Sequence, residues 1–264
     1  MRRIESLEEE HKILLEIAKE FHRVCVKHNI PYYMLGGTML GAVRHGGFIP
    51  WDDDMDFGIP RRYFSEFFKI AEKEFPSHLR ISTVYNSRRI TGGFAKIDDT
   101  RTYMVRSLFR GEDMKIGVNI DVFPIDYADN DFSRYSKNRI ISRLLQIQAY
   151  RLLSLQDRPL PKKVVALFIK AVLSPLRRGA IIDFIVKHLI VDDGPNMANH
   201  FGAWSIKEIV PREVMGTPTP YRFENIELYG VEDADRYLKS LYKDWHQLPP
   251  DGKRKIHALE IYYL

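Results

Sequence analysis

The sequence predicts a mixed α/β (α+β) fold, in which helices pack on a mixed sheet and a helical region is added to that core. The hydrophobic patterns of the first half run in the order helix, strand, short helix, strand, helix and three further strands. Residues 132–200 are then mostly helical by pattern. We therefore expect a sheet-bearing core over 1–130 and a helical and C-terminal region over 131–264, packed together as one continuous domain.

Residues 5–29 are predicted to form an amphipathic helix, because apolar residues recur every three or four positions. The apolar positions are Leu7, Ile13, Leu14, Ile17, Ala18, Phe21, Val24 and Cys25. Ser6 followed by Glu9 matches a capping box at the start of this helix. Pro31 marks its end.

The elements that follow are predicted from apolar runs, alternation and helical periodicity. In chain order they are a strand at 31–37, a short helix at 38–47, a strand at 52–60, a helix at 61–75, strands at 80–86 and 91–99 joined by a turn, and a strand at 118–130. Residues 216–257 are expected to form a loop, followed by a short tail.

The segment 164–191 is the most apolar part of the second half and is interrupted by Pro175, Arg177 and Arg178. It predicts either two helices buried against the core or a pair that lies in a membrane interface with its basic residues toward lipid headgroups. An uninterrupted run of 18 or more apolar residues, which a spanning helix needs, does not occur in the sequence.

Charge and cysteine content indicate the surroundings of the protein. The net charge is +5 and the pI about 9.1, which suits a polyanionic partner or an anionic lipid surface, or is simply a solvated basic surface. Cys25 is the only cysteine, so an intramolecular disulfide is excluded. With no signal-peptide pattern at the N-terminus, we expect a cytoplasmic protein, with contact at the inner face of the cell membrane as a further expectation.

The acidic run at 52–56 has the alternation of a metal-binding strand. Met55 and Phe57 are expected to face the core, so Asp54 and Asp56 must share the open face. At two residues of rise, about 7 Å, two carboxylates can converge on one divalent cation. Oxygen ligands favour Mg²⁺ or Mn²⁺ over zinc.

The glycines before these acids predict a phosphate-binding turn. Gly36, Gly37 and Thr38 end a strand and precede a helix, where exposed backbone N–H groups bind phosphate and glycine permits close approach. Arg44 and Lys96 carry charges that would neutralise further phosphate oxygens. The alternative interpretation is a polar turn between buried strands.

Residues 32–61, "YYMLGGTMLGAVRHGGFIPWDDDMDFGIPR", closely resemble the LicD family of phosphotransferases and the corresponding segment of the fukutin-related proteins. Weaker matches follow in "FAKIDDTRT", "GVNIDVFPIDY", "RFENIEL" and "YLKSLYKDWHQLPPDGKRKIH", so the resemblance covers nearly the whole chain. It implies a nucleotidyltransferase-like core that carries a glycine signature, an Asp-x-Asp pair and a third carboxylate on a later strand. Asp121 in "NIDVF" best matches that third carboxylate.

The resemblance also implies a reaction: transfer of a phospho-alcohol, such as phosphocholine, from a CDP-activated donor to a sugar hydroxyl of a glycan or lipid-linked glycan precursor, with release of CMP. Asp54, Asp56 and Asp121 would hold Mg²⁺ or Mn²⁺, and Asp121 would accept the proton of the attacking hydroxyl. Gly36, Gly37, Thr38, Arg44, His45 and Lys96 would contact the donor, although for His45 a structural role in its loop fits equally.

Two other functions remain open at this point. One is true nucleotidyl transfer, which places NMP from an NTP on a small molecule, nucleic acid or protein. The other is a nucleotide-binding module without activity. Under the leading interpretation no nucleic acid partner is expected. The sequence departs from the family near the C-terminus, where "YGVEDAD" follows "FENIEL" and Lys243 stands between Tyr242 and Asp244, which leaves the acceptor and the transferred alcohol open.

Overall fold

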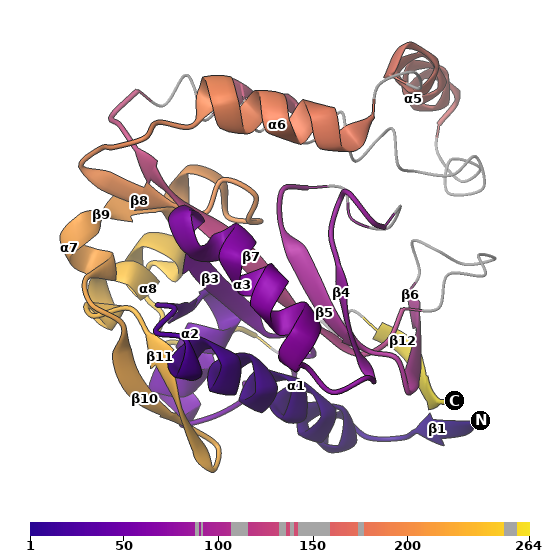
Figure 1. Cartoon of the computed structure of the whole chain (residues 1–264), viewed down its shortest axis with the longest axis vertical. Helices are drawn as coiled ribbons and strands as arrows, with labels where there is room; N and C mark the ends of the chain where they lie inside the picture. The colour runs from indigo at the N-terminus through magenta and orange to yellow at the C-terminus, as the bar shows by residue number, and fades with distance from the viewer. Residues whose placement is uncertain are drawn as a thin grey trace.

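The computed structural model describes the chain except for residues 88–89, 91, 107–115, 132–135, 138–139, 142–158, 174–176 and 251–257. Its centre is a mixed sheet with the strand order β2-β3-β7-β5-β4, to which β8 and β9 are added beside β7 (Figure 1). β3 and β7 are parallel, whereas the other pairs are antiparallel. The strands are β2 Tyr33–Met34, β3 Asp56–Pro60, β4 Leu79–Ser82, β5 Ala95–Asp99, β7 Asn119–Ala128, β8 Asn196–Ala198 and β9 Ile209–Pro211. The predicted mixed fold is confirmed.

Two long helices, α1 and α3, pack on the same face of this sheet (Figure 1). Phe21 of α1 contacts Phe57 of β3 and Phe67 of α3, with ring centroids 4.7 and 5.2 Å apart. The helices are α1 Leu7–Lys27, α2 Gly36–His45, α3 Arg61–Glu74, α5 Leu160–Leu173, α6 Arg178–Leu189, α7 Arg212–Met215, α8 Ala234–Tyr242 and the 3₁₀ helix η3 Ser205–Glu208.

α1 forms where its periodicity predicts it. The apolar positions from Ile13 to Cys25 are buried, and the Ser6 side chain accepts a hydrogen bond from the Glu9 backbone N–H at 3.2 Å. The Glu9 carboxylate accepts a hydrogen bond from Arg2 rather than returning to Ser6. The helix start is therefore capped from one side, and the second half of the predicted capping box is replaced by an ion pair.

The prediction that 216–257 is a loop is wrong over most of its length. This segment contains an antiparallel hairpin and α8, and the chain end after it forms a strand that joins a small second sheet between β1 and β6. These additional strands are β10 Thr219–Phe223, β11 Ile226–Gly230, β12 Ala258–Tyr263, β1 Arg2–Ile4 and β6 Thr102–Arg106. The two-residue turn Glu224-Asn225 was missed because Glu224, with φ 54°, occupies the left-handed position where glycine is usual.

The strand predicted over 52–60 begins only at Asp56, and the acids before it lie in an irregular stretch. The predicted alternation nevertheless extends through this stretch. Asp53, Met55 and Phe57 are buried, whereas Asp54 and Asp56 are partly exposed. The reason is that the Asp121 N–H already donates to the Met55 carbonyl at 2.8 Å, which holds the chain straight ahead of β3.

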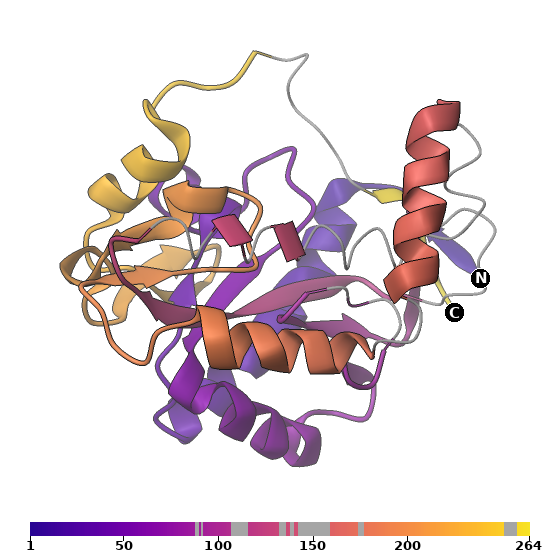
Figure 2. The ribbon, with the colours of Figure 1, turned by 90° about the horizontal axis from the view of Figure 1, so that it is seen from above.

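The apolar segment 164–191 contains α5 and α6, and these two differ in burial. α6 buries Ile182 and Ile185, whereas α5 lies at the edge of the molecule and leaves Leu160 76% and Phe168 69% exposed (Figure 2). The interpretation as two buried helices therefore holds for α6 and is wrong for α5. Among the helices that the structure describes, none has the length and apolar character needed to cross a bilayer.

Candidate functional site

Parallel pairing of β3 and β7 brings two of the predicted carboxylates together. Asp56 and Asp121 are paired across these strands at their first common position. Neighbouring strands lie about 4.8 Å apart and paired residues share a face, so both side chains project from the open face of the sheet. Burial raises the pKa of the Asp56 carboxyl well above its usual range, and the charges of Asp54 and Asp121 raise it further. The structure thus places Asp121 beside Asp56 across the two strands, with Asp54 within electrostatic reach of Asp56.

Lys96 supplies the positive charge at this point. It lies opposite Asp121 on the antiparallel strand β5, and its ammonium group forms an ion pair with Asp121 and donates to Asn119 Oδ1 at 3.0 Å. The ammonium group also lies 5.8 Å from the centre of the Phe94 ring. The sequence alone does not determine toward which face of the sheet Lys96 points. The sheet register places it on the same face as the acids.

The acidic cluster has the chemistry of a divalent-cation site. Its donors are carboxylate oxygens, and the mutual repulsion that raises the pKa of Asp56 is what a divalent cation relieves. With the side chains as placed, no group of three or more Asp, Glu, His or Cys residues within the described ranges is arranged to hold a metal ion. Lys96 instead balances part of the negative charge, through Asp121.

The glycines at the start of α2 lie directly against the acids. A Cβ at Gly36, which has φ +51°, would stand 3.3 Å from Asp56 Oδ2, and a Cβ at Gly37 would stand 2.6 Å from Asp52 Oδ2. The Gly36 N–H donates to the Tyr237 hydroxyl at 3.1 Å. A side chain at either glycine would therefore displace a carboxylate, which gives these glycines a role in addition to the predicted approach of a phosphate.

Thr38 connects the helix start to the acidic strand. Its hydroxyl oxygen accepts a hydrogen bond from the Asp56 backbone N–H at 2.7 Å, and the side chain is only 4% exposed. The hydroxyl hydrogen remains available as a donor. Thr38 thus fixes Asp56 relative to α2, whether or not it also contacts a ligand.

Arg44 and His45 lie at the other end of α2, about 12 Å along the axis from Gly36 at 1.5 Å per residue. Arg44 donates to the Trp245 carbonyl at 2.9 Å and to His45 Nε2 at 3.0 Å. Burial lowers the pKa of Arg44, and burial together with the Arg44 charge lowers the pKa of His45. The structure therefore places these two residues apart from the glycines with which the sequence grouped them.

The C-terminal half supplies a wall of the site that the sequence analysis missed. Tyr237 and Tyr242 of α8 are buried or nearly so, and burial raises the pKa of both hydroxyls. The charges of Asp56 and Asp54 add to the effect on Tyr242, which places its hydroxyl beside the acids. These tyrosines are about 200 positions from Gly36, so no local spacing could have revealed them.

Glu208, the last residue of η3, is a further acid beside this wall. It is 6% exposed, and burial raises the pKa of its carboxyl to about 7. The Trp204 N–H donates to Glu208 Oε1 at 2.7 Å, which fixes the side chain. Its charge also raises the pKa of Asp56 and of Tyr237, so it lies within electrostatic reach of the acidic cluster.

The amino-acid sequence of this chain is similar to those of known proteins. Residues 29–148 match the family described as LicD/FKTN/FKRP, nucleotidyltransferase domain. The chain carries a LicD-family domain. The predicted resemblance is confirmed, and the matched range contains Gly36, Asp54, Asp56, Lys96 and Asp121.

The relatives extend this finding beyond the domain. The chain is 27% identical to the lipopolysaccharide cholinephosphotransferase LicD of Haemophilus influenzae over 266 aligned residues, which cover 98% of both proteins. It is 44% identical over 48 residues to the ribitol 5-phosphate transferase FKRP of human and mouse, a match that spans 18% of this chain and 10% of FKRP. An uncharacterised protein of Rickettsia prowazekii is 52% identical over 46 residues. The likeness supports a transferase.

The loop that leaves the LicD-family motif is held by the hairpin of the C-terminal half. Gly46 ends α2 with φ +69°, and its carbonyl accepts from the Glu224 N–H at 2.8 Å. The Glu224 carboxylate accepts from the Phe48 N–H at 3.0 Å. Glu224 therefore has a structural role here, and Gly46 and Gly47 form the turn that leads toward β3.

Proposed function

We propose that this protein transfers a phospho-alcohol, such as phosphocholine, from a CDP-activated donor to a sugar hydroxyl of a glycan or lipid-linked glycan precursor, and releases CMP. The observation that supports the proposal is the register that pairs Asp56 with Asp121, with Asp54 within electrostatic reach, beside the start of α2 in a LicD-family domain. The likeness to the H. influenzae cholinephosphotransferase over nearly the whole chain supports the class of reaction.

Each part of the site has a role in this reaction. Asp54, Asp56 and Asp121 would hold Mg²⁺ or Mn²⁺, and a bound cation would supply charge neutralisation for the phosphoryl oxygens and the leaving CMP. Lys96, at the edge of the same cluster, would neutralise a donor phosphate oxygen. The backbone N–H groups of Gly37 and Thr38 point outward from the first turn of α2 and would bind the donor phosphates.

Two carboxylates are candidates to take the proton from the attacking hydroxyl. Asp121 is paired with Asp56 across the strands, and one of its carboxylate oxygens accepts from the Lys96 ammonium group. Burial raises the pKa of Glu208 to about 7, the range in which a general base is most effective at neutral pH. A pH–rate profile of Glu208→Gln separates the two: loss of a limb near pH 7 assigns the base to Glu208, and an unchanged profile assigns it to Asp121.

The test of the function is a donor panel. The purified protein is incubated with CDP-choline, other CDP-alcohols or NTPs, with Mg²⁺ or Mn²⁺, and a glycan acceptor. Product mass and the release of CMP or pyrophosphate are measured. CMP release with a phospho-alcohol added to the acceptor supports the proposal, and Asp54→Asn with Asp56→Asn should abolish it.

The same panel tests the alternatives. Nucleotidyl transfer is favoured by the description of the family domain, and it would appear as pyrophosphate release with NMP left on the acceptor. A nucleotide-binding module would bind donor without product. Either of these results would overturn the proposed reaction.

We further propose that α5 rests on an anionic membrane surface at the inner face of the cell membrane, where a lipid-linked acceptor would be presented. Four of its exposed apolar residues follow one stripe at i, i+4 spacing, namely Leu160, Val164, Phe168 and Val172, all at least 55% exposed, and Val165 and Leu167 are exposed beside it. The helix contains no acidic residue and carries Lys162 and Lys163 in its first turn. An apolar stripe beside lysines suits an interfacial helix.

Vesicle flotation tests this contact. The protein should float with vesicles of phosphatidylcholine and phosphatidylglycerol and much less with phosphatidylcholine alone. Val164→Ser with Phe168→Ser should abolish flotation. Val26→Ser, which removes a similarly exposed apolar side chain from α1, is the control and should float normally. Loss of self-association instead of flotation in the double variant would show that α5 contacts a second copy of the chain.

A further inference from the structure

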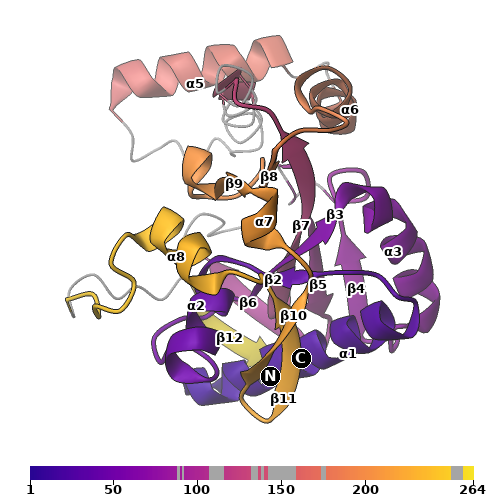
Figure 3. The same ribbon diagram turned by 90° about the vertical axis from the view of Figure 1, so that its left-hand side faces the viewer.

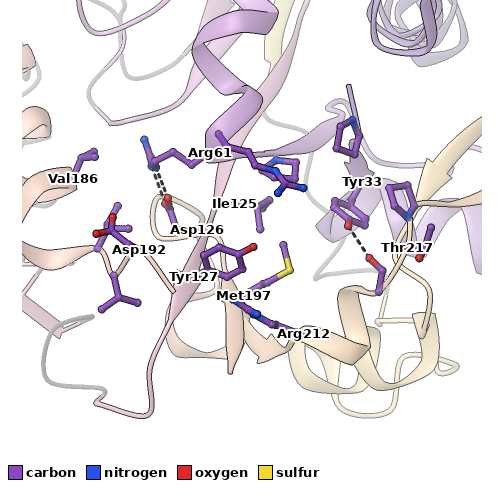
Figure 4. A pocket seen from close by; sticks show the side chains of 17 residues that line it. Tyr33, Arg61, Ile125, Asp126, Tyr127, Val186, Asp192, Met197, Arg212 and Thr217 are labelled. Carbon is purple, nitrogen blue, oxygen red and sulfur yellow. Dashed lines mark hydrogen bonds and ion pairs between the residues drawn. The ribbon is translucent and has the colours of Figure 1, made fainter. Parts of the chain in front are cut away.

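A cavity of about 570 Å³ lies at the far end of β3 and β7 from the acidic cluster (Figure 4). Pro60 and Tyr127 line it, four and six residues beyond Asp56 and Asp121 along their strands. At about 3.3 Å per residue this separates the cavity from the acids by at least about 13 Å. Its volume is in the range of small-molecule sites. The cavity is therefore distinct from the acidic cluster.

Three arginines and two aspartates, Asp126 and the exposed Asp192, line this cavity, and only Arg61 is fully balanced by a direct partner among them. Arg61 forms a two-pronged ion pair with the buried Asp126, which neutralises both (Figure 4). Arg212 stacks over the Tyr127 ring at 4.0 Å and pairs with the exposed Asp193, while its buried Nε has no hydrogen-bond partner among the residues that the structure describes. A buried N–H donor without a partner is costly unless a ligand accepts from it.

The third arginine, Arg62, is exposed and contacts the ring of Tyr63 at 4.7 Å. Within the described part of the chain it makes no ion pair. The cavity therefore offers one unbalanced guanidinium from α3 and one unsatisfied guanidinium N–H from α7.

The start of α3 adds to this positive character. α3 begins at Arg61, its N-cap is Pro60, and it has neither a side-chain cap nor an acidic residue in its first turn. Two arginines at a helix N-terminus oppose the helix dipole, which favours negative charge there. Because the cavity opens at this terminus, a bound anion would satisfy the exposed N–H groups and both guanidinium groups at once.

Apolar side chains line the cavity between and beside the arginines (Figure 4). They are Ile125, Val186, Ile190 and Met197. Tyr33 also lines the cavity, with its hydroxyl donating to the Gly216 carbonyl at 2.8 Å (Figure 4). A ligand that fits has an anionic group at the arginines and an uncharged part against these apolar side chains.

We propose that this cavity binds a small phosphorylated organic molecule, with its phosphate between Arg62, Arg212 and the start of α3. The site is separate from the acidic cluster, so the proposal does not require the proposed reaction. The phosphate can belong to a free metabolite or to a phosphorylated acceptor, and the chemistry of recognition is the same for both.

The experiment uses the full chain carrying Asp54→Asn and Asp56→Asn, in EDTA, so that binding at the acidic cluster is removed. Titration calorimetry measures the affinity for glucose 6-phosphate, with glucose as the uncharged control. We expect binding of glucose 6-phosphate only, and Arg62→Gln or Arg212→Gln should each weaken it about tenfold, the usual loss for one charge-assisted hydrogen bond. Arg62 is exposed and Asp193, the partner of Arg212, is 80% exposed, so neither change should prevent folding.

Arg23→Gln is the charge-matched control, because Arg23 pairs with Glu74 at the end of α3 that is opposite to Arg61 and the cavity. The affinity of the Arg23→Gln variant for glucose 6-phosphate should be unchanged. No binding of glucose 6-phosphate, or an equal loss in the control and in the Arg62→Gln and Arg212→Gln variants, would overturn the proposal. With the active protein, a raised KM for a phosphorylated acceptor in Arg62→Gln identifies the ligand as the acceptor, and an unchanged KM identifies a free metabolite.

Discussion

Replacing Glu208 with Gln should make the protein more stable at alkaline pH. Burial raises the pKa of the Glu208 carboxyl from 4.5 to about 7, so the folded protein holds this proton more tightly than the unfolded chain does. Between these two pH values the folded state binds more protons, and stability falls as the pH rises. Above pH 7 the Glu208 carboxylate is charged while buried near other acids, which makes the folded state less stable than at lower pH.

The magnitude follows from the pKa itself. A rise from 4.5 to about 7 corresponds to about 3 kcal/mol, at about 1.4 kcal/mol for each factor of ten in acidity. Gln is neutral throughout, and its carbonyl can still accept from the Trp204 N–H that now bonds to Oε1 at 2.7 Å. The variant should therefore match the natural protein near pH 5 and exceed its stability at pH 8 by up to about 3 kcal/mol.

Urea unfolding of both proteins at pH 5, 6, 7 and 8, in EDTA, measures this difference directly. All other titrating groups are shared, so the pH dependence of the difference belongs to Glu208. Glu213→Gln on α7 is the control, since Glu213 is 65% exposed and its pair with Arg236 lies on the surface. A difference that does not change with pH, or a less stable Glu208→Gln protein at pH 8, would refute the reasoning.

Four further predictions concern the start of α2, its end and the core behind the sheet. Thr38→Val should destabilise the protein by about 1–2 kcal/mol and lower activity, because the Asp56 N–H loses its acceptor, whereas Thr38→Ser should retain both properties in chemical unfolding and activity assays. Gly41→Ala should cost about 1–3 kcal/mol, since its Cβ would meet the Gly47 carbonyl. Gly37→Ala should change the thermal midpoint little and reduce activity, because only the Asp52 carboxylate has to move; equal melting losses for the two glycine variants would contradict this assignment. Phe21→Ala should lower the free energy of unfolding by about 3–5 kcal/mol, because its ring is fully buried between Phe57 and Phe67. Urea unfolding measures this loss, and a loss no larger than that for replacing an exposed aromatic residue would contradict the packing.

Local patterns predicted those parts of the fold that depend on local physics. α1 follows from a long apolar periodicity. The face on which Asp54 and Asp56 lie follows from the burial of Met55 and Phe57, which alternate with them. The position of Asp121 was inferred from the family resemblance, and the parallel register of β3 and β7 places it beside Asp56. Its role as a ligand stays a prediction.

Contacts between distant parts of the chain could not be predicted in this way. The hairpin turn has Glu224 at its left-handed position, where glycine is usual, although Asn225 follows it. The hydrogen bond from Arg44 to the Trp245 carbonyl joins residues about 200 positions apart, which no local spacing reveals. Glu208 and Tyr237 carry no local signal at all. The packing of α8 against α2, and of η3 against α8, brings them to the acids.

The hydrogen bond from the Gly36 N–H to the Tyr237 hydroxyl has a consequence for how the molecule can be divided (Figure 3). A fragment that ends with the matched family range, at residue 148, would keep every carboxylate of the acidic cluster and lose the side chain that receives this N–H. It would also lose the Trp245 carbonyl that holds Arg44. The geometry of α2 therefore depends on residues beyond the matched range. Exchange of the C-terminal half between relatives would alter this geometry as well as the surface that α8 presents.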